Sequence, residues 1–190
     1  AMTAYIANPL IHGWAAEGDV AKAKTIYDSI GIGKRESVAD IAQVLSRFND
    51  VIMARLFNHQ DIIDLAKHSS VPVVNGLTDF NHPCQIMADL FTIYEKLGRL
   101  EDFKIAYIGD GNNIVHSWLK LSTRLKFQLN IATPEGYEPD SGAISEAISV
   151  RTSDIELFNN PFDAVKGADV ILGLSAKGVL KKEMVKSMAK

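Results

Sequence analysis

Short runs of aliphatic and β-branched residues alternate with helix-like segments along most of this chain. That alternation limits its fold more than any other feature of the sequence. The apolar runs predict strands at 51–54, 71–74, 104–108, 128–132, 155–157 and 169–172. Helical patterns separate most of these runs, and the longest spans 83–97. Successive strands joined through helices pair in parallel. We therefore predict an α/β fold, with parallel sheets flanked by helices in Rossmann-like three-layer units.

The length of 190 residues suits two small lobes. Gly98 follows the longest helical pattern and marks a natural helix end, so we place the boundary there. The expected lobes are 1–98, which starts with two short helices within 8–30, and 99–190. Both lobes should be built from α/β units.

Composition narrows the expected partners and location. The formal net charge is −3, and no run of apolar residues is long enough to span a membrane, so we expect neither a nucleic-acid nor a membrane partner. The single cysteine, Cys84, cannot form an internal disulfide, and the printed N-terminus does not resemble a signal peptide. These features lead us to expect a cytoplasmic protein.

The segment Asn81-His-Pro-Cys-Gln85 is the sharpest motif. It follows a predicted strand and opens a helix, whose N-terminal N–H groups and positive dipole end attract anions. His82 and Gln85 are three residues apart and so share one face. Imidazole and amide groups suit a small, planar, anionic acyl phosphate. The motif is equally compatible with an ordinary capped helix that has a loop histidine.

Several segments in one order resemble the ornithine carbamoyltransferase family. The run Asp79 to Asp89 resembles the carbamoyl-phosphate motif of that family. Upstream, 33–37 and 44–55 resemble the preceding family segment, and downstream 109–117 and 132–139 resemble the start of its ornithine domain. The stretch 159–170 extends the likeness after a gap. The resemblance implies carbamoyl transfer to ornithine, with citrulline and phosphate as products, and a homo-oligomer.

The resemblance also implies roles for four residues. His82 would polarise the carbamoyl oxygen, Gln85 would hold the carbamoyl group, and Arg55 would contact the carbamoyl phosphate. Asn113 would bind the α-carboxylate of ornithine. No metal and no organic cofactor are implied.

The loop Gly109-Asp-Gly-Asn-Asn113 also invites comparison with a dinucleotide fingerprint, because it joins a strand to a helix. The third glycine of that fingerprint would fall at position 114, where isoleucine stands. We therefore predict that NAD does not bind. His116 and Ser117 follow one turn later and are expected to be packing and capping groups, not a catalytic pair.

Both ends depart from the family pattern. Residues 1–30 contain no arginine, although a Ser-Thr-Arg-Thr-Arg anion motif is expected before Gly33. After Asp169 the family loop Asp-x-x-x-Ser-Met-Gly is missing, and 172–188 resembles instead the NAD domain of malic enzymes. These departures predict impaired turnover. They leave two alternatives, a non-catalytic recombined or designed α/β scaffold and a malic-enzyme-like NAD-binding domain.

Overall fold

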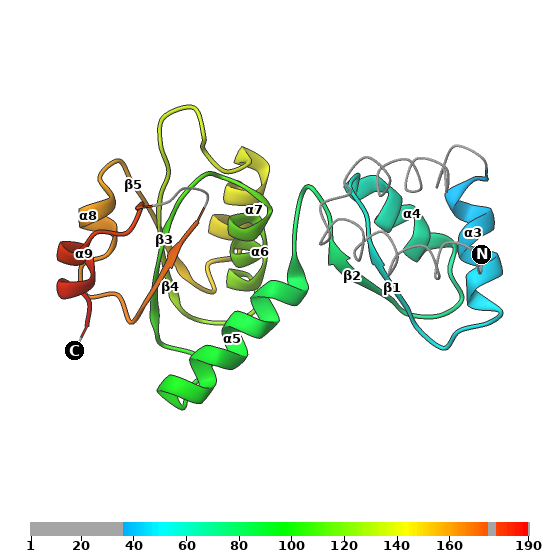
Figure 1. Ribbon diagram of the computed structural model, residues 1–190, viewed down its shortest axis with the longest axis horizontal. Coiled ribbons are helices and arrows are strands. Elements are labelled where there is room, and N and C mark those ends of the chain that lie inside the picture. The colour runs from blue at the N-terminus through cyan, green and yellow to red at the C-terminus, as the bar shows by residue number, and fades with distance from the viewer. Residues whose placement is uncertain (1–35, 175–177, 190) are drawn as a thin grey trace, which may run out of the picture. The chain divides into compact units, whose positions relative to one another are not determined.

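The computed structural model describes residues 36–174 and 178–189, which form parts of two compact units that divide between Gly76 and Leu77. The helices expected within 8–30 lie outside the described residues. Each unit is built from helices and strands that alternate along the chain (Figure 1).

The described part of the first unit, from residue 36 onward, contains two helices and a two-stranded sheet. Its elements are, in order, α3 (Val38–Ser46), β1 (Ile52–Arg55), α4 (His59–His68) and β2 (Val73–Leu77). Ser37 and Asn58 cap the two helices by accepting main-chain N–H groups with their side chains. Four buried apolar residues form the core between the helices and the strands: Ala42, Ile52, Ile62 and Leu65.

Strand β2 differs from the sequence prediction. We predicted a strand at 71–74, whereas the observed strand spans Val73–Leu77 and so runs through Asn75 and Gly76. A Cβ built on Gly76 would lie 2.8 Å from Met53 Sδ and 3.1 Å from the carbonyl oxygen of Ala54. Glycine at this position therefore permits a close approach to β1 and does not form a turn.

The second unit is a four-stranded parallel sheet with the strand order β5-β4-β3-β6. Its strands are β3 (Lys104–Ile108), β4 (Gln128–Ala132), β5 (Asp154–Phe158) and β6 (Val170–Gly173). Its helices are α5 (Pro83–Leu97), α6 (Asn113–Ser122), α7 (Ser141–Val150), α8 (Pro161–Ala164) and α9 (Lys182–Lys186). The predicted α/β fold with parallel strands is confirmed.

Alternate residues of β3 face two different cores, which makes three layers. Ile105 and Tyr107 pack with buried residues of α5, α6 and α7. Ala106 and Ile108 point to the other face and pack with Ala164 of α8 and with residues near the C-terminal end. Figure 1 shows α5, α6 and α7 on one side of this sheet and α8 and α9 on the other.

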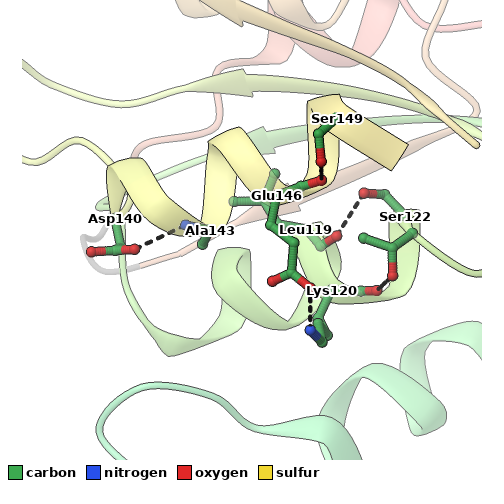
Figure 2. A network of polar contacts seen from close by, with 8 residues as sticks. Leu119, Lys120, Ser122, Asp140, Ala143, Glu146 and Ser149 are labelled. Carbon is green, nitrogen blue, oxygen red and sulfur yellow. Dashed lines mark hydrogen bonds and ion pairs between the residues drawn. The ribbon is translucent and has the colours of Figure 1, made fainter. Parts of the chain in front are cut away.

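Helices α6 and α7 lie side by side, and Figure 2 shows the polar contacts along them. The Lys120 ammonium pairs with the Glu146 carboxylate across the two helices. Asp140 caps α7, because its Oδ1 accepts the N–H of Ala143 at 2.9 Å. The cap fixes the N-terminus of α7, which borders the site described below.

The C-terminal segment is built into the second core. Met184 of α9 is buried there. Main-chain bonds from Gly167 N to Ser187 O at 2.9 Å and from Ala189 N to Ala168 O at 3.0 Å hold the segment beside the loop before β6. None of the helices in the described part of the chain has the length and apolar character needed to cross a membrane.

Candidate functional site

His82 is the N-cap of α5, and Pro83 is its first helical residue. The Nδ1 of His82 accepts the main-chain N–H of Gln85 at 3.4 Å. An accepting Nδ1 places the proton of the neutral ring on Nε2. His82 is therefore a donor for a carbonyl oxygen, set at a helix N-terminus that favours an anion.

Gln85 lies in the first turn of α5 and is exposed. Its side-chain amide donates to Asp89 Oδ1 at 2.9 Å, one turn further along the same helix. That bond restricts the amide, whose oxygen is an acceptor of the kind a carbamoyl amine requires. His82 and Gln85 thus lie together, as the sequence predicted for the helix start.

Three side chains of α6 hold the loop that leads into α5. The amide of Asn113 donates to the carbonyl oxygen of Thr78 at 2.9 Å. His116 Nδ1 lies 2.9 Å from the carbonyl oxygen of Phe80, and Ser117 Oγ accepts the main-chain N–H of His82 at 2.7 Å. The spacing i, i+3 and i+4 puts the three side chains on one face of the helix.

Asn113 was predicted to bind the α-carboxylate of ornithine. In the structure one N–H of its amide is bonded to the Thr78 carbonyl oxygen. An asparagine amide has two N–H groups and an oxygen, so this bond uses part of its capacity. Its role toward ornithine stays a prediction.

Main-chain packing fixes the loop before α6. Gly111 N donates to the Tyr137 carbonyl oxygen at 2.7 Å. A Cβ built on Gly111 would lie 2.3 Å from the carbonyl carbon of Glu138 and from the nitrogen of Pro139. In a dinucleotide-binding loop, the second glycine lets the main chain approach the pyrophosphate. In this chain the space beside Gly111 is filled by the main chain of residues 137–139.

Tyr107 of β3 forms hydrogen bonds to the same loop, residues 109–113. Its hydroxyl donates to the carbonyl oxygen of Asp110 at 2.7 Å and lies 3.2 Å from Asn112 Oδ1. Burial, with a smaller contribution from the negative charge of Asp110, raises the pKa of the Tyr107 hydroxyl well above its usual range. The phenol therefore stays neutral and keeps its donor.

Arg55 ends β1 in the first unit, where it is exposed. His82, Gln85 and Asn113 belong to the second unit. The role of Arg55 toward carbamoyl phosphate stays a prediction. Within the described ranges, 36–174 and 178–189, no group of three or more His, Cys, Asp or Glu side chains is arranged to hold a metal ion.

The hydrogen bonds between α6 side chains and the main chain of the 78–82 loop were not predicted from the sequence. The partners of Asn113, His116 and Ser117 are main-chain groups 35 or 36 positions away. Main-chain atoms carry no residue identity, so their positions leave no pattern in the sequence. The clustering of three short polar side chains at i, i+3 and i+4 was the available signal.

Two domain families match the chain in succession. Residues 16–95 match the carbamoyl-P binding domain of aspartate/ornithine carbamoyltransferase, and residues 101–186 match the Asp/Orn binding domain of the same family. The chain belongs to the aspartate/ornithine carbamoyltransferase family.

Curated relatives in this family include two that are named ornithine carbamoyltransferase. The chloroplastic protein of Pisum sativum is 56% identical over 144 residues, which are 76% of this chain and 38% of the pea protein. The Thermococcus kodakarensis protein is 53% identical over 139 residues, which are 72% of this chain and 44% of that protein. The chain thus spans less than half the length of these two relatives.

Solved structures of carbamoyltransferases share the fold. The Pyrococcus furiosus ornithine carbamoyltransferase superposes with a TM-score of 0.74 at 41% identity, over 82% of this chain and 56% of that chain. The Burkholderia thailandensis enzyme gives 0.75 at 37% identity, over 83% of this chain and 55% of that chain.

The family match corrects the interpretation of the two ends. The two carbamoyltransferase matches span residues 16–95 and 101–186, so they include half of residues 1–30 and most of 172–188, the two segments that depart from the family motifs. The resemblance of 172–188 to malic enzymes and the idea of a recombined chain are not borne out. Met184, which lies within the second match, is buried in the second core beside Ala164 and Ala168.

Proposed function

We propose that this chain serves in ornithine carbamoyl transfer, in which carbamoyl phosphate and ornithine give citrulline and phosphate. The observation that carries the proposal is the orientation of His82. Its Nδ1 accepts the Gln85 N–H, so its Nε2–H is the donor at the N-terminus of α5. A donor there matches a carbamoyl oxygen, while the helix end favours the attached phosphate.

Carbamoyl phosphate would be bound at both of its ends. In our proposal the His82 Nε2–H donates to the carbonyl oxygen, and the Gln85 side-chain oxygen accepts an N–H of the carbamoyl amine. Arg55 would bind the phosphate, because a guanidinium forms charge-assisted bonds to phosphate oxygens. No metal or cofactor takes part in this scheme.

The chemical step joins the side-chain amine of ornithine to the carbamoyl carbon. The amine lone pair forms the C–N bond, and negative charge develops on the carbonyl oxygen, where the His82 donor stabilises it. The C–O bond to phosphate then breaks, phosphate leaves with the bonding pair, and the proton that the amine nitrogen loses goes to the leaving phosphate. Asn113 would orient ornithine through its α-carboxylate, so that catalysis is chiefly positioning and electrostatic stabilisation.

We further propose that turnover by this chain is slow. The expected arginine-rich anion motif is absent from residues 1–30. Two or three lost charge-assisted hydrogen bonds cost about 3–9 kcal/mol, which is on the order of two to six decades in rate. We also propose a boundary between the two lobes near Gly98, from the helix end there, and a cytoplasmic location, from the composition. The resemblance leads us to propose a homo-oligomer.

Carbamoyl-phosphate binding tests the proposed function. Carbamoyl phosphate with 13C in its carbonyl carbon is titrated with the whole chain, and the 13C resonance is followed. We expect a saturable shift that His82→Ala removes, with Gln85→Leu weakening it. His68→Ala is the matched control, since His68 lies in the last turn of α4 and is exposed. A shift of equal size in the wild type and His82→Ala would refute the proposal.

A further inference from the structure

The imidazole of His116 is bonded through both of its nitrogens. Nδ1 lies 2.9 Å from the carbonyl oxygen of Phe80, and Nε2 accepts the main-chain N–H of Asp140 at 3.0 Å. The ring also lies against the Phe80 ring, with centroids 4.9 Å apart and an interplanar angle of 30°. His116 therefore joins the 78–82 loop to the N-terminus of α7.

These partners define the protonation state of the ring. A carbonyl oxygen only accepts, so Nδ1 must carry a proton and donate it to Phe80. A main-chain N–H only donates, so Nε2 must present its lone pair to Asp140. The contacts require the neutral tautomer with its proton on Nδ1, which is opposite to the tautomer that the Gln85 contact requires of His82.

We propose that His116, as this neutral Nδ1–H tautomer, is a positioning residue for His82. This inference rests on the proposed function in so far as His82 acts on carbamoyl phosphate. Phe80 is two residues before His82, so a bond to its carbonyl oxygen limits the path by which the chain enters α5. Ser117, the next residue of α6, accepts the N–H of His82 itself.

The second hydrogen bond of His116, from the Asp140 N–H, connects the 78–82 loop to the N-terminus of α7. Asp140 is held in turn, because its side chain caps α7 through the Ala143 N–H. Helix α7 packs on α6 and contributes Ala147 to the larger core. Through His116 the 78–82 loop is thus tied to two packed helices and not to α6 alone.

The tautomer is tested by NMR on the whole 15N-labelled chain at neutral pH. We expect the ring of His116 to show a protonated Nδ1 and an unprotonated Nε2. We also expect a scalar coupling across the N–H···N bond between Asp140 and His116. A ring protonated on Nε2 would overturn the inference, because it cannot accept the Asp140 N–H.

Three variants separate the two contacts. His116→Phe keeps an aromatic ring against Phe80 and removes both hydrogen bonds. His116→Asn places an amide near the former Nδ1 and so preserves the bond to Phe80, whereas His116→Gln reaches the former Nε2 and preserves acceptance from Asp140. His68→Gln is the control for a histidine outside the second unit. We expect His116→Phe to weaken carbamoyl-phosphate binding about tenfold, His116→Asn to restore part of it, and His68→Gln to leave it unchanged.

Amide hydrogen exchange gives a readout that needs no ligand. His116→Phe should speed the exchange of both the His82 and the Asp140 N–H groups, whereas the N–H groups of β3 should exchange as in the wild type. If the His82 amide exchanges at the wild-type rate in a folded His116→Phe variant, the positioning role is refuted. If exchange changes as expected but the wild type does not bind carbamoyl phosphate, the proposed function fails and the structural role of His116 stands.

Discussion

The main-chain N–H of His82 donates to the hydroxyl of Ser117 at 2.7 Å, which ties the cap of α5 to the second turn of α6. Ser117 is buried, and its hydroxyl also donates to the Asn113 carbonyl oxygen at 2.6 Å. One hydroxyl thus serves as acceptor for the residue that we propose to act on the carbamoyl group and as donor within its own helix.

Ser117→Ala should destabilise the protein by about 1–2 kcal/mol, because it leaves the partly buried His82 N–H without that acceptor. Urea unfolding of the wild type and the variant measures the difference. Ser149→Ala is the matched control: Ser149 is an exposed helix residue whose hydroxyl donates to the Glu146 carbonyl oxygen, and its loss should change stability by less than about 0.5 kcal/mol. Equal effects of the two substitutions would contradict the importance of the His82 contact.

Gly111→Ala should destabilise the protein by about 2 kcal/mol or more, because the added Cβ would meet main-chain atoms of Glu138 and Pro139 at 2.3 Å. Gly98→Ala separates steric conflict from backbone strain. Gly98 has a φ of +69° with nothing within 4 Å of its Cβ position, so its cost should be about 1 kcal/mol of strain. Thermal unfolding that ranks Gly98→Ala as the more damaging change would show that the 109–113 loop can relax.

Tyr107 should contribute to the alkaline stability profile. Its pKa is raised in the folded protein above the ordinary value of 10.0, so the folded state keeps the phenol neutral at a pH where the unfolded chain ionises. The stability from this group is therefore fully present below pH 10 and is lost as the pH rises above it. Tyr107→Phe should weaken that alkaline loss, at a cost of about 1 kcal/mol near neutral pH from the bond to Asp110.

Urea unfolding as a function of pH measures this effect. Tyr137→Phe is the control, since Tyr137 is exposed and is not in the core. If Tyr107→Phe and the wild type lose stability in parallel above pH 10, the phenol is not the group responsible.

NAD should not bind measurably. Ile114 stands where the fingerprint needs its third glycine, and it packs against the larger core. Segment 137–139 already occupies the close approach at Gly111. Isothermal titration of the whole chain with NAD should give no saturable heat. Stoichiometric binding in the micromolar range would contradict both structural arguments.

Sequence periodicity was enough to predict the parallel strands of the second unit. The runs at 104–108 and 128–132 are flanked by helical patterns, and the parallel pairing of β3 and β4 follows from that order. Periodicity misplaced the end of β2, because Asn-Gly taken alone is typical of a turn. The reason for a glycine within this strand is the closeness of Met53 in the neighbouring strand β1, which leaves no room for a Cβ at Gly76. A contact with another strand leaves no pattern among the neighbouring residues of the sequence.

The candidate site also has a part that the sequence predicts and a part that it does not. His82 and Gln85 were predictable because a helix start and a known motif place them within one turn. The two hydrogen bonds of the His116 ring were not predictable, because their partners are main-chain atoms of Phe80 and Asp140, which lie 36 and 24 positions away in the sequence. The tautomer of a histidine is determined by such partners and has no counterpart in composition or spacing.

Citrulline formation tests the central claim most directly. The whole chain, at high concentration, is given ornithine and carbamoyl phosphate, alongside His82→Ala and the control His68→Ala. We predict slow citrulline formation that His82→Ala lowers about a hundredfold and His68→Ala leaves unchanged. Citrulline formed at the same rate by the wild type and His82→Ala would contradict the claim that His82 acts on the carbamoyl group.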